Sequence, residues 1–549
     1  MLKKIRVALS ILLFSLITLY FLDFRGFLPR GLQWLTEIQF VPALLALNVA
    51  VLIGLLLLTL LFGRVYCSFI CPMGVYQDMV AWISRRVNKK KRYRYHKAKN
   101  GLRVIVLAST VVAFILGFTL LVGLLDPYGA YGRMVTHLLR PAYLAGNNLL
   151  ASIFTSFNNF TFYKVSVYIV SVSSLVIALI TLLGIGYMTW RGGRSYCNTV
   201  CPVGTILGFL SRYSLFKVRI DEVKCNACGL CAMKCKASCI DAKNKRVDYS
   251  RCVTCFNCLG NCHRGAMEYK LIVPWKRNKQ LKVEESQKTK PLNEKSRSNN
   301  AEELLVQLTN CVTGQPVIVN NQEPTSSLDA SKRRFLTALL AISLPAKELM
   351  AKTGSEKLLS KRTFKRQTPI APPGVPSIDH LLQKCISCHL CVSKCPSRVI
   401  KPALLEYGLE GMMQPMLYFE RGFCNYDCTV CGDVCPTGAI LPLTKEEKNH
   451  TQMGQVQLIL ENCIVCHDET SCGACSEHCP TQAVRMIPYK GILTIPEINP
   501  DICVGCGGCE YVCPAIPFKA IHVEGLTTQR RIEIEHDEVK EIQINDFGF

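Results

Sequence analysis

The sequence predicts a chain with two kinds of structure: a polytopic α-helical membrane domain of four spans, and small α+β domains built around cysteines. Two observations predict this fold class. Four segments are apolar enough to cross a bilayer, which takes about 20 apolar residues. The chain has 549 residues and 31 cysteines, and most of the cysteines fall into short, regularly spaced runs. A chain of this length is not a small disulfide scaffold.

The predicted spans cover about residues 7–22, 41–62, 104–125 and 165–188. Basic residues precede the first span, as in a signal peptide, but no small-residue cleavage site follows it. We therefore expect a retained anchor. The stretch "LLRPAYLAGNNLLASIF" (138–154) is interpreted as an interfacial helix. If it crossed the membrane instead, the topology of everything after it would be inverted.

The placement of Lys and Arg predicts the orientation of the spans. Ten of these residues and no acidic residue lie between Arg85 and Arg103, whereas the loop 23–40 has balanced charges. Basic loops stay on the cytoplasmic side, so the second loop, the amino terminus and the region after the fourth span are expected inside. The formal net charge is +24. Because many basic residues lie beside the spans, a membrane surface is a better partner for this charge than nucleic acid.

The same cysteine motif follows the second and the fourth span. "GRVYCSFICPMG" and "GRSYCNTVCPVG" share Gly-Arg-x-Tyr and then Cys-x3-Cys-Pro, with cysteines at Cys67, Cys71, Cys197 and Cys201. Residues i and i+4 share a helix face, and the topology puts all four thiols at one side of the membrane. The duplicated unit has two interpretations. The pairs either pack as reduced thiols, or meet at a pseudo-twofold axis and hold a further metal centre.

The region after the fourth span has the cysteine spacing of a two-cluster bacterial ferredoxin. Its two runs are Cys225, Cys228, Cys231 and Cys235, and Cys252, Cys255, Cys258 and Cys262. In this pattern three cysteines bind one [4Fe–4S] cluster and the fourth binds the other cluster. Cys239 is a spare that can replace Cys235, and Lys236 and His263 stand where proline usually follows. Structural zinc is the alternative, but zinc sites rarely interleave two sets of four cysteines.

Four further runs occupy the C-terminal part of the chain. They are Cys385, Cys388, Cys391 and Cys395; Cys424, Cys428, Cys431 and Cys435; Cys463, Cys472, Cys475 and Cys479; and Cys503, Cys506, Cys509 and Cys513. The third run also contains Cys466, which can replace Cys463 or Cys472. Six runs predict six [4Fe–4S] clusters, and thiolate–iron bonds would supply folding energy that such small cores lack.

These features predict the domain organisation. A membrane domain (1–214) is followed by a two-cluster ferredoxin domain (215–275), a flexible polar linker (276–330), a four-cluster domain (370–530) and a tail (531–549). Before the four-cluster domain, "SKRRFLTALLAISLPA" resembles a twin-arginine export signal within 331–350, and it would form a short fifth span. The alternative is a basic amphipathic helix that stays inside.

We expect no haem. Cys-x2-Cys-His, the attachment motif of c-type haem, occurs at Cys385 and Cys463. In the first case the cysteines complete a ferredoxin run, and in the second only the spare thiol leaves room for haem. A b-type haem needs histidines within the spans, which contain none, since His96 and His137 are expected in loops.

On these motifs the chain resembles a known pair of families. The first 270 or so residues resemble NapH, the ferredoxin-type membrane subunit of periplasmic nitrate reductase systems, and are related to the NosR and MauN families. The part from "SKRRFL" onward resembles NapG, an exported four-cluster polyferredoxin. The resemblance implies a multi-pass protein of the bacterial inner membrane, with the first ferredoxin domain in the cytoplasm and the second in the periplasm.

The resemblance also implies a function: oxidation of membrane quinol and delivery of electrons to an extracytoplasmic reductase or small carrier. No residues suggest bond-making catalysis, so we expect an electron-transfer subunit rather than a self-contained enzyme. Asp126, Arg133 and His137 are the polar candidates for a quinone pocket, but the preferred interpretation is that Asp126-Pro127 simply ends a helix. Two other functions stay open: an assembly factor that reduces copper or thiols, and a relay with all clusters in the cytoplasm.

Overall fold

The computed structural model describes residues 2–24, 26–88, 93–271 and 364–533. Met1–Ile272 and Arg362–Phe549 together form one compact unit. The predicted linker (276–330) and the predicted internal signal (331–350) lie outside the described residues, as does the tail beyond residue 533. The predicted domain boundaries therefore stay predictions.

The first and fourth predicted spans are single helices. Helix α1 is Leu2–Leu22 and α10 is Val172–Gly192, with 21 residues each. Both are long and apolar enough to cross a membrane, judged by length and composition. Ser171 directly precedes α10, and its hydroxyl accepts a hydrogen bond from the Ser174 N–H, as is usual for a residue that caps a helix start.

The second and third predicted spans are not continuous helices. The second consists of α3 (Phe40–Leu45) and α4 (Val49–Phe62), and the third of α6 (Asn100–Ile115) and α7 (Thr119–Leu125). Each break contains a residue in the left-handed backbone region, Leu47 with φ 54° and Gly117 with φ 86°, which a right-handed helix cannot include. Four continuous spans are thus not confirmed, because only α1 and α10 reach spanning length among the described helices.

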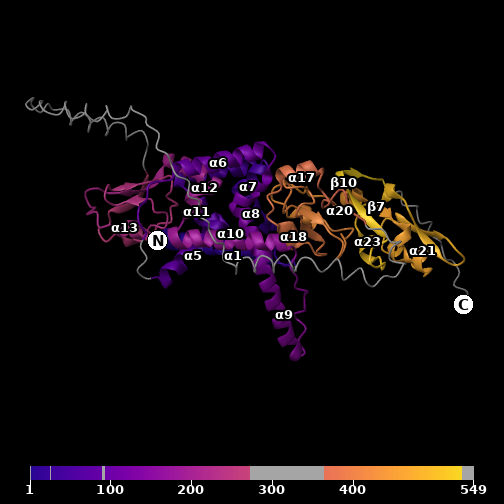
Figure 1. Ribbon diagram of the computed structural model, residues 1–549. Coiled ribbons are helices and arrows are strands. Elements are labelled where there is room, and N and C mark those ends of the chain that lie inside the picture. The colour runs from indigo at the N-terminus through magenta and orange to yellow at the C-terminus, as the bar shows by residue number, and fades with distance from the viewer. Residues whose placement is uncertain (1, 25, 89–92, 272–363, 534–549) are drawn as a thin grey trace, which may run out of the picture. The chain divides into compact units, whose positions relative to one another are not determined.

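Shorter helices connect these elements. The two Cys-x3-Cys stretches form one helical turn each, a π-helix at Tyr66–Ile70 and α11 at Ser195–Thr199, and are followed by α5 (Pro72–Val87) and α12 (Pro202–Leu210). Proline at the first position suits a helix start, where its missing N–H costs nothing. Helix α8 (Pro127–Met134), a π-helix (Val135–Leu139) and α9 (Arg140–Ser156) follow one another. Figure 1 shows α9, the predicted interfacial helix, extending away from the other helices.

The two cysteine-rich parts are α+β, as predicted, with short antiparallel strand pairs. In the first part, β1 (Phe216–Ile220) pairs with β4 (Met267–Leu271), β2 (Ile240–Asp241) pairs with β3 (Arg246–Val247), and α13 spans Leu230–Lys234. In the second part, β5 (Ile400–Pro402) pairs with β6 (Pro415–Leu417), β7 (Thr451–Leu458) with β10 (Ile521–Arg531), and β8 (Val484–Pro488) with β9 (Thr494–Ile498).

One-turn helices lie beside the cysteines of the second part. They are α18 (Leu390–Lys394), α19 (Val430–Asp433), α21 (Ile464–Asp468), α22 (Ala474–Glu477) and α23 (Gly508–Val512), and α17 (Ile378–Lys384) precedes them. The hydrophobic core is shared between parts of the chain. One buried cluster joins the helices, the first cysteine-rich part and the loop at Ile386. A second cluster lies within the C-terminal part.

Candidate functional site

The two Cys-x3-Cys-Pro motifs meet in the interior of the helical part. Their four cysteines, Cys67, Cys71, Cys197 and Cys201, are each only 3–4% exposed and belong to one buried cluster. All pairs among them interact electrostatically. The duplicated unit that the sequence predicts therefore brings its four thiols together.

An arginine from each half reaches into the other half. The Arg64 guanidinium donates to the Cys197 carbonyl (3.0 Å), and the Arg194 guanidinium donates to the Cys67 carbonyl. Both arginines are fully buried. Reciprocal contacts of this kind are what two units related by a twofold axis make.

A glycine in each motif makes this approach possible. A Cβ on Gly74 would lie 2.2 Å from the Cys67 carbonyl oxygen, and a Cβ on Gly204 would lie 2.2 Å from that of Cys197. No side chain fits at that distance, so the motif extends to Cys-x3-Cys-Pro-x-Gly. The second cysteine of each motif precedes helix α5 or α12, and the Cys201 sulfur accepts a hydrogen bond from the Gly204 N–H (3.3 Å).

Polar side chains tie this thiol site to the first cysteine-rich part. Asp78 of α5 pairs with Arg6 (2.7 Å), Arg194 (2.8 Å) and Lys236 (3.2 Å). Burial opposes the charge on the Asp78 carboxylate, but the charges of Arg194, Lys236 and Arg6 hold its pKa well below the usual range. Lys236, which replaces the usual proline after Cys235, therefore anchors the first cysteine-rich part to α5.

Cavities in the cysteine-rich parts test whether [4Fe–4S] clusters fit. One cavity is lined by Cys252, Cys255 and Cys258 together with Cys235 of the other run. The spare Cys239 lines the same cavity, with its sulfur 3.5 Å from that of Cys235. Three neighbouring cysteines plus a distant fourth is the arrangement that a ferredoxin cluster needs.

Three cavities in the C-terminal part repeat this arrangement. Their cysteines are Cys385, Cys388, Cys391 and Cys435; Cys463, Cys472, Cys475 and Cys513; and Cys479, Cys503, Cys506 and Cys509. In each cavity the fourth cysteine comes from another run, and Cys466 is absent from the lining. The residues of the remaining C-terminal set, Cys424, Cys428, Cys431 and Cys395, interact electrostatically. These thiols fit [4Fe–4S] clusters, whereas no three His, Cys, Asp or Glu among the described residues are arranged to bind a single metal ion.

The three polar candidates for a quinone pocket are buried contacts. Asp126 accepts a hydrogen bond from the Gly129 N–H (2.5 Å) at the start of α8, so it starts this helix. Arg133 donates to the Gly123 carbonyl (2.9 Å) and to the Ser387 carbonyl (3.1 Å). His137, expected in a loop, lies instead in the π-helix after α8.

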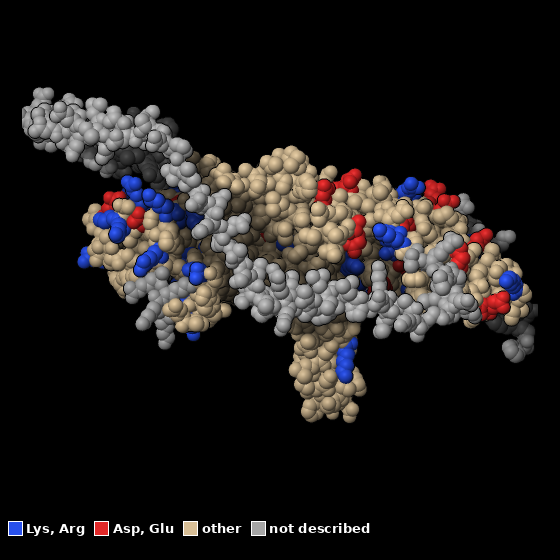
Figure 2. Space-filling model, in the orientation of Figure 1, with Lys and Arg blue, Asp and Glu red and all other residues tan. Residues whose placement is uncertain are grey.

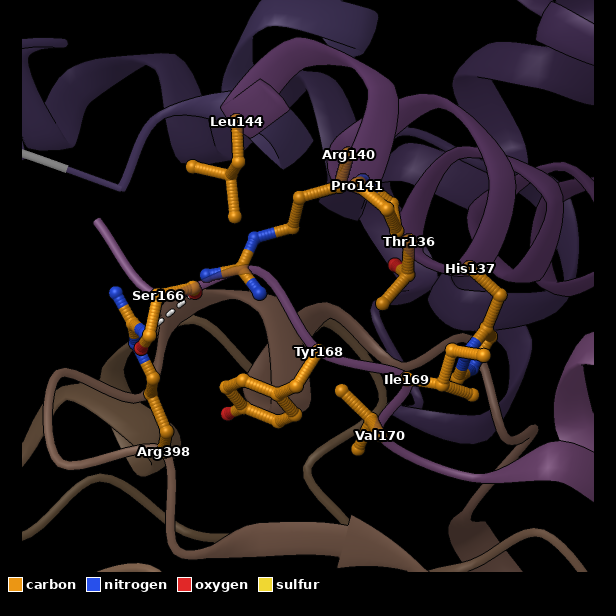
Figure 3. Close-up of a pocket in the computed structure, with 10 residues that line it drawn as sticks. All are labelled: Thr136, His137, Arg140, Pro141, Leu144, Ser166, Tyr168, Ile169, Val170 and Arg398. Carbon is orange, nitrogen blue, oxygen red and sulfur yellow. Dashed lines mark hydrogen bonds between the residues drawn. The ribbon is translucent and has the colours of Figure 1, made fainter. Parts of the chain in front are cut away.

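His137 also contacts the first C-terminal cysteine run. Its Nε2 lies 2.7 Å from Nδ1 of His389, the histidine of the "CISCH" motif. Beside this pair, Figure 3 shows a cavity that contains Arg140, Tyr168 and Arg398, with Arg398 hydrogen-bonded to Ser166. The loop with Cys385 and Cys388 therefore packs directly on the helical part.

Family models match three parts of the chain. A model described as a 4Fe-4S binding domain matches residues 44–90 and 173–221, so that each match includes one Cys-x3-Cys-Pro motif. Two models described as 4Fe-4S dicluster domains match residues 384–440 and 470–515. The chain contains ferredoxin-type 4Fe-4S domains.

Similar proteins carry the same kind of domain. The methylamine utilization ferredoxin-type protein MauM of Methylobacillus flagellatus is 28% identical over 204 residues, 35% of this chain and 84% of MauM. The ferredoxin-type protein NapF of Escherichia coli is 26% identical over 167 residues, 30% of this chain and 93% of NapF. The putative electron transport protein YccM of Escherichia coli is 23% identical over 221 residues, 40% of this chain and 55% of YccM. These similarities support iron–sulfur electron transfer of the ferredoxin type, and no solved structure matches the chain.

Sequence reasoning missed the residues that surround the thiol site. Gln77 donates to the Cys197 sulfur (3.1 Å), and Asn198 accepts from Arg64 (2.8 Å). Neither recurs in the other copy of the motif, where Leu207 and Ser68 stand at the matching positions. The repeated arginine was the one signal in the sequence that pointed to them.

Proposed function

We propose that this chain lies in a bacterial inner membrane and carries electrons from membrane quinol through [4Fe–4S] clusters to a reductase or small carrier in the periplasm. Each quinol would become quinone, releasing two protons and two electrons. The clusters would pass these electrons singly, and the acceptor outside would be reduced. The first cysteine-rich part would lie in the cytoplasm and the second in the periplasm.

One observation carries the proposal: the two cysteine-rich parts are linked to opposite ends of α1, the first through Asp78 of α5 and the second directly. Near its start, Arg6 binds Asp78, which also binds Lys236 of the first part. Just after its end, Asp23 binds Lys394 of the second part (3.0 Å). A helix of 21 residues is about 32 Å long at 1.5 Å per residue, close to the thickness of a bilayer core, about 30 Å.

The distribution of charged side chains supports the same placement of the two cysteine-rich parts on opposite sides of the membrane. The basic loop packs on the first cysteine-rich part, where Arg103 donates to the Ser250 hydroxyl (3.1 Å) and Arg251 lies over the Tyr95 ring. Basic loops stay in the cytoplasm. On the face in Figure 2 the helical part carries almost no charged side chains, whereas Lys and Arg gather over the first cysteine-rich part and both signs occur over the second. An uncharged belt between charged ends suits a membrane protein.

The cavity of Figure 3 marks our proposed place for the quinol headgroup, although it is too small for a quinol ring as it stands and would have to widen to admit one. It lies where the helices meet the second cysteine-rich part, and its polar groups include Arg140, Ser166 and Tyr168. His137 connects the cavity to His389, which follows Cys388. A quinol bound there would be next to the proposed Cys385 cluster. That cluster would receive its electrons first and pass them on towards the acceptor in the periplasm.

The resemblance to NapH and NapG suggests which protein would accept the electrons. A fusion of the two would feed a periplasmic reductase of the nitrate reductase type, using all six clusters. The relatives named NapF and MauM are ferredoxin-type proteins, which supports this class of function. An assembly factor that reduces copper or thiols is the competing function, and it predicts no reduction of the clusters by quinol.

Reporter fusions test the sidedness. Alkaline phosphatase, which is active only outside the cytoplasm, and green fluorescent protein are fused in turn after Leu271 and after Phe549. We expect fluorescence after Leu271 and phosphatase activity after Phe549, and alanine replacement of Lys332, Arg333 and Arg334 should abolish the latter. A second cysteine-rich part that protease added to intact spheroplasts cannot cleave would replace the outward relay by the cytoplasmic one.

Reduction by quinol tests the function itself. Purified protein under anaerobic conditions is mixed with a reduced menaquinol or ubiquinol analogue, and cluster reduction is followed by electron paramagnetic resonance. We expect reduced clusters with both cysteine-rich parts contributing. Clusters that dithionite reduces but neither quinol does would favour the assembly factor.

A further inference from the structure

The four cysteines of the two Cys-x3-Cys-Pro motifs have no role in the six ferredoxin runs, yet all four are buried together inside the helical part. We propose that Cys67, Cys71, Cys197 and Cys201 together hold one iron–sulfur cluster, which passes electrons between the two cysteine-rich parts. The cluster itself is inferred from the site alone, and only its relay role rests on the proposed function.

Arg64 is the first argument for an anion at this site. Its guanidinium is fully buried and donates to the Asn198 side chain, to the carbonyls of Ser250 and Cys197, and to the Cys67 sulfur (3.9 Å). No carboxylate within the described part of the chain forms an ion pair with it. An unpaired buried charge is very costly. Thiolates bound to iron would supply the missing negative charge.

The second argument is the set of hydrogen bonds to sulfur. Gln77 donates its amide N–H to the Cys197 sulfur at 3.1 Å, and the Gly204 backbone N–H donates to the Cys201 sulfur at 3.3 Å. Hydrogen bonds to the sulfurs are among the features that set the potential of iron–sulfur clusters. Neutral thiols packed in an apolar core have no need of such donors.

The geometry favours one shared cluster over one cluster in each half. A cluster of either common type is held by four cysteines, and each motif supplies only two. The reciprocal bonds from Arg64 and Arg194 hold the halves together directly beside the thiols. The family model described as 4Fe-4S binding matches both halves, each with one cysteine pair.

Contacts on both sides of the site support its role as a relay. Towards the first cysteine-rich part, the Arg194 N–H donates to the Lys236 carbonyl (2.9 Å), and the Asn198 amide donates to the Ala237 carbonyl (3.3 Å). Both carbonyls follow Cys235 directly. A cluster at the four thiols would thus have the Cys235 set as its neighbour.

Towards the second cysteine-rich part, the connection runs through α7. Tyr196, which precedes Cys197, donates to the Leu125 carbonyl (2.9 Å) at the end of α7. Arg133 joins the Gly123 carbonyl of α7 to the Ser387 carbonyl, between Cys385 and Cys388. The proposed cluster would take one electron from a reduced cluster on one side and give one electron to an oxidised cluster on the other, with no change in bonding.

Iron content tests the shared cluster. Anaerobically purified protein should contain about 24 irons for the six ferredoxin clusters, at four each, plus the irons of the proposed cluster. Cys67→Ser and Cys197→Ser should each remove the same increment, about two irons for a [2Fe–2S] cluster or about four for a [4Fe–4S] cluster. The double variant should lose no more than either single variant. Cys466→Ser, the control, should keep all the iron.

Other results would overturn the proposal. A double variant that loses twice the increment means one cluster in each half. Unchanged iron together with lost zinc means a structural zinc site. Unchanged iron with no zinc in the wild type means packed thiols or a disulfide. None of these measurements depends on quinol or on membrane sidedness, so failure of the cluster and failure of the proposed function are distinguishable.

A milder variant covers the case in which the serine variants do not fold. Gln77→Leu copies Leu207, the residue at the matching position of the second motif, and removes one donor to the Cys197 sulfur. In a redox titration followed by electron paramagnetic resonance, one cluster signal should shift to a lower potential, because the lost hydrogen bond had stabilised the reduced, more negative form. A titration in which every signal keeps its potential contradicts the proposed cluster.

Discussion

Replacing Asp78 by asparagine is expected to loosen α5 from α1 and from the first cysteine-rich part. The carboxylate is 9% exposed and forms ion pairs with Arg6, Arg194 and Lys236 at 2.7, 2.8 and 3.2 Å. Asparagine has nearly the same shape but no charge. The variant therefore leaves three buried cations without their shared anion.

The magnitude follows from these distances. At about 3 Å and an effective dielectric constant of about 20, each pair gains about 5 kcal/mol before desolvation. Desolvation cancels most of this gain, and removing one partner of a buried pair typically costs about 3–5 kcal/mol. We expect a loss of about 4 kcal/mol, which changes the equilibrium constant for local opening about 1,000-fold.

Hydrogen–deuterium exchange of α5 (Pro72–Val87) in detergent measures this opening. Asp221→Asn is the control, because Asp221 pairs with Lys224 at 3.5 Å at the surface, where the two side chains are 32% and 54% exposed. Such surface pairs contribute about 0–1 kcal/mol. Exchange of α5 in Asp78→Asn that stays within tenfold of wild type would refute the reasoning. So would an equal effect of the control.

The pKa of Asp78 predicts how the effect depends on pH. Burial opposes ionisation, but the three cations lower the pKa of the folded protein well below that of an unfolded aspartate, about 3.9. A carboxyl with a lowered pKa contributes its full stability above the unfolded pKa and loses it as the pH falls further. The difference between wild type and Asp78→Asn should therefore be constant from pH 5 to 8 and shrink only in stronger acid.

Three more predictions concern other parts of the chain. Cys463→Ser should lose about four irons, the content of one [4Fe–4S] cluster, and Cys466→Ser none, by iron assay; equal losses would contradict the cavity assignment. Gly74→Ala should remove the iron of the proposed shared cluster but leave the ferredoxin signals, because its Cβ would lie 2.2 Å from the Cys67 carbonyl; full iron content would be the contrary result. Burial and the charges of Arg133 and Arg140 lower the pKa of His137 to about 4, so protonation of His137 opposes its buried position. The protection of the loop 385–391 against hydrogen–deuterium exchange should therefore fall as the pH drops from about 6.5 towards 4. It should stay constant above pH 7.

The cysteine-rich parts were largely predictable from the sequence. Iron–sulfur ligation fixes the spacing between cysteines tightly, so the runs indicate α+β ferredoxin-type domains without any knowledge of the rest. The structure adds which distant cysteine joins each set, for example Cys513 beside Cys463. It also separates Cys466 from that set, which spacing alone left open because the third run has five thiols.

The helical part was less predictable. Hydropathy reports how apolar a segment is but not whether its backbone is continuous, so the breaks at Leu47 and Gly117 did not show. The burial of His137 was missed for another reason. Its partner, His389, lies 252 residues further along the chain, and no periodic pattern connects positions so far apart.

Comparison of the two motif copies distinguishes the residues that form the thiol site from those that contact neighbouring parts of the chain. Among the residues that recur, the arginines make the reciprocal contacts with the cysteine carbonyls, and the last glycines leave room for this close approach. The positions that differ contact different neighbours. Asp78 binds Lys236, whereas Gly208 at the matching position leaves room for Arg103 beside the Ser250 carbonyl.

The tyrosines recur in both copies but contact different neighbours. Tyr66 and Tyr196 both precede the first cysteine of their motif and are both buried. The Tyr66 hydroxyl donates to Gln39 and accepts from the Phe40 N–H at the start of α3, while the Tyr196 hydroxyl donates to the Leu125 carbonyl at the end of α7. The half-helices α3 and α7 are thus held by matching residues of the two copies. Because the recurring arginines bind the cysteine carbonyls of the other copy and the recurring tyrosines hold these short helices, the duplicated unit is best explained as a device for bringing two cysteine pairs to one place.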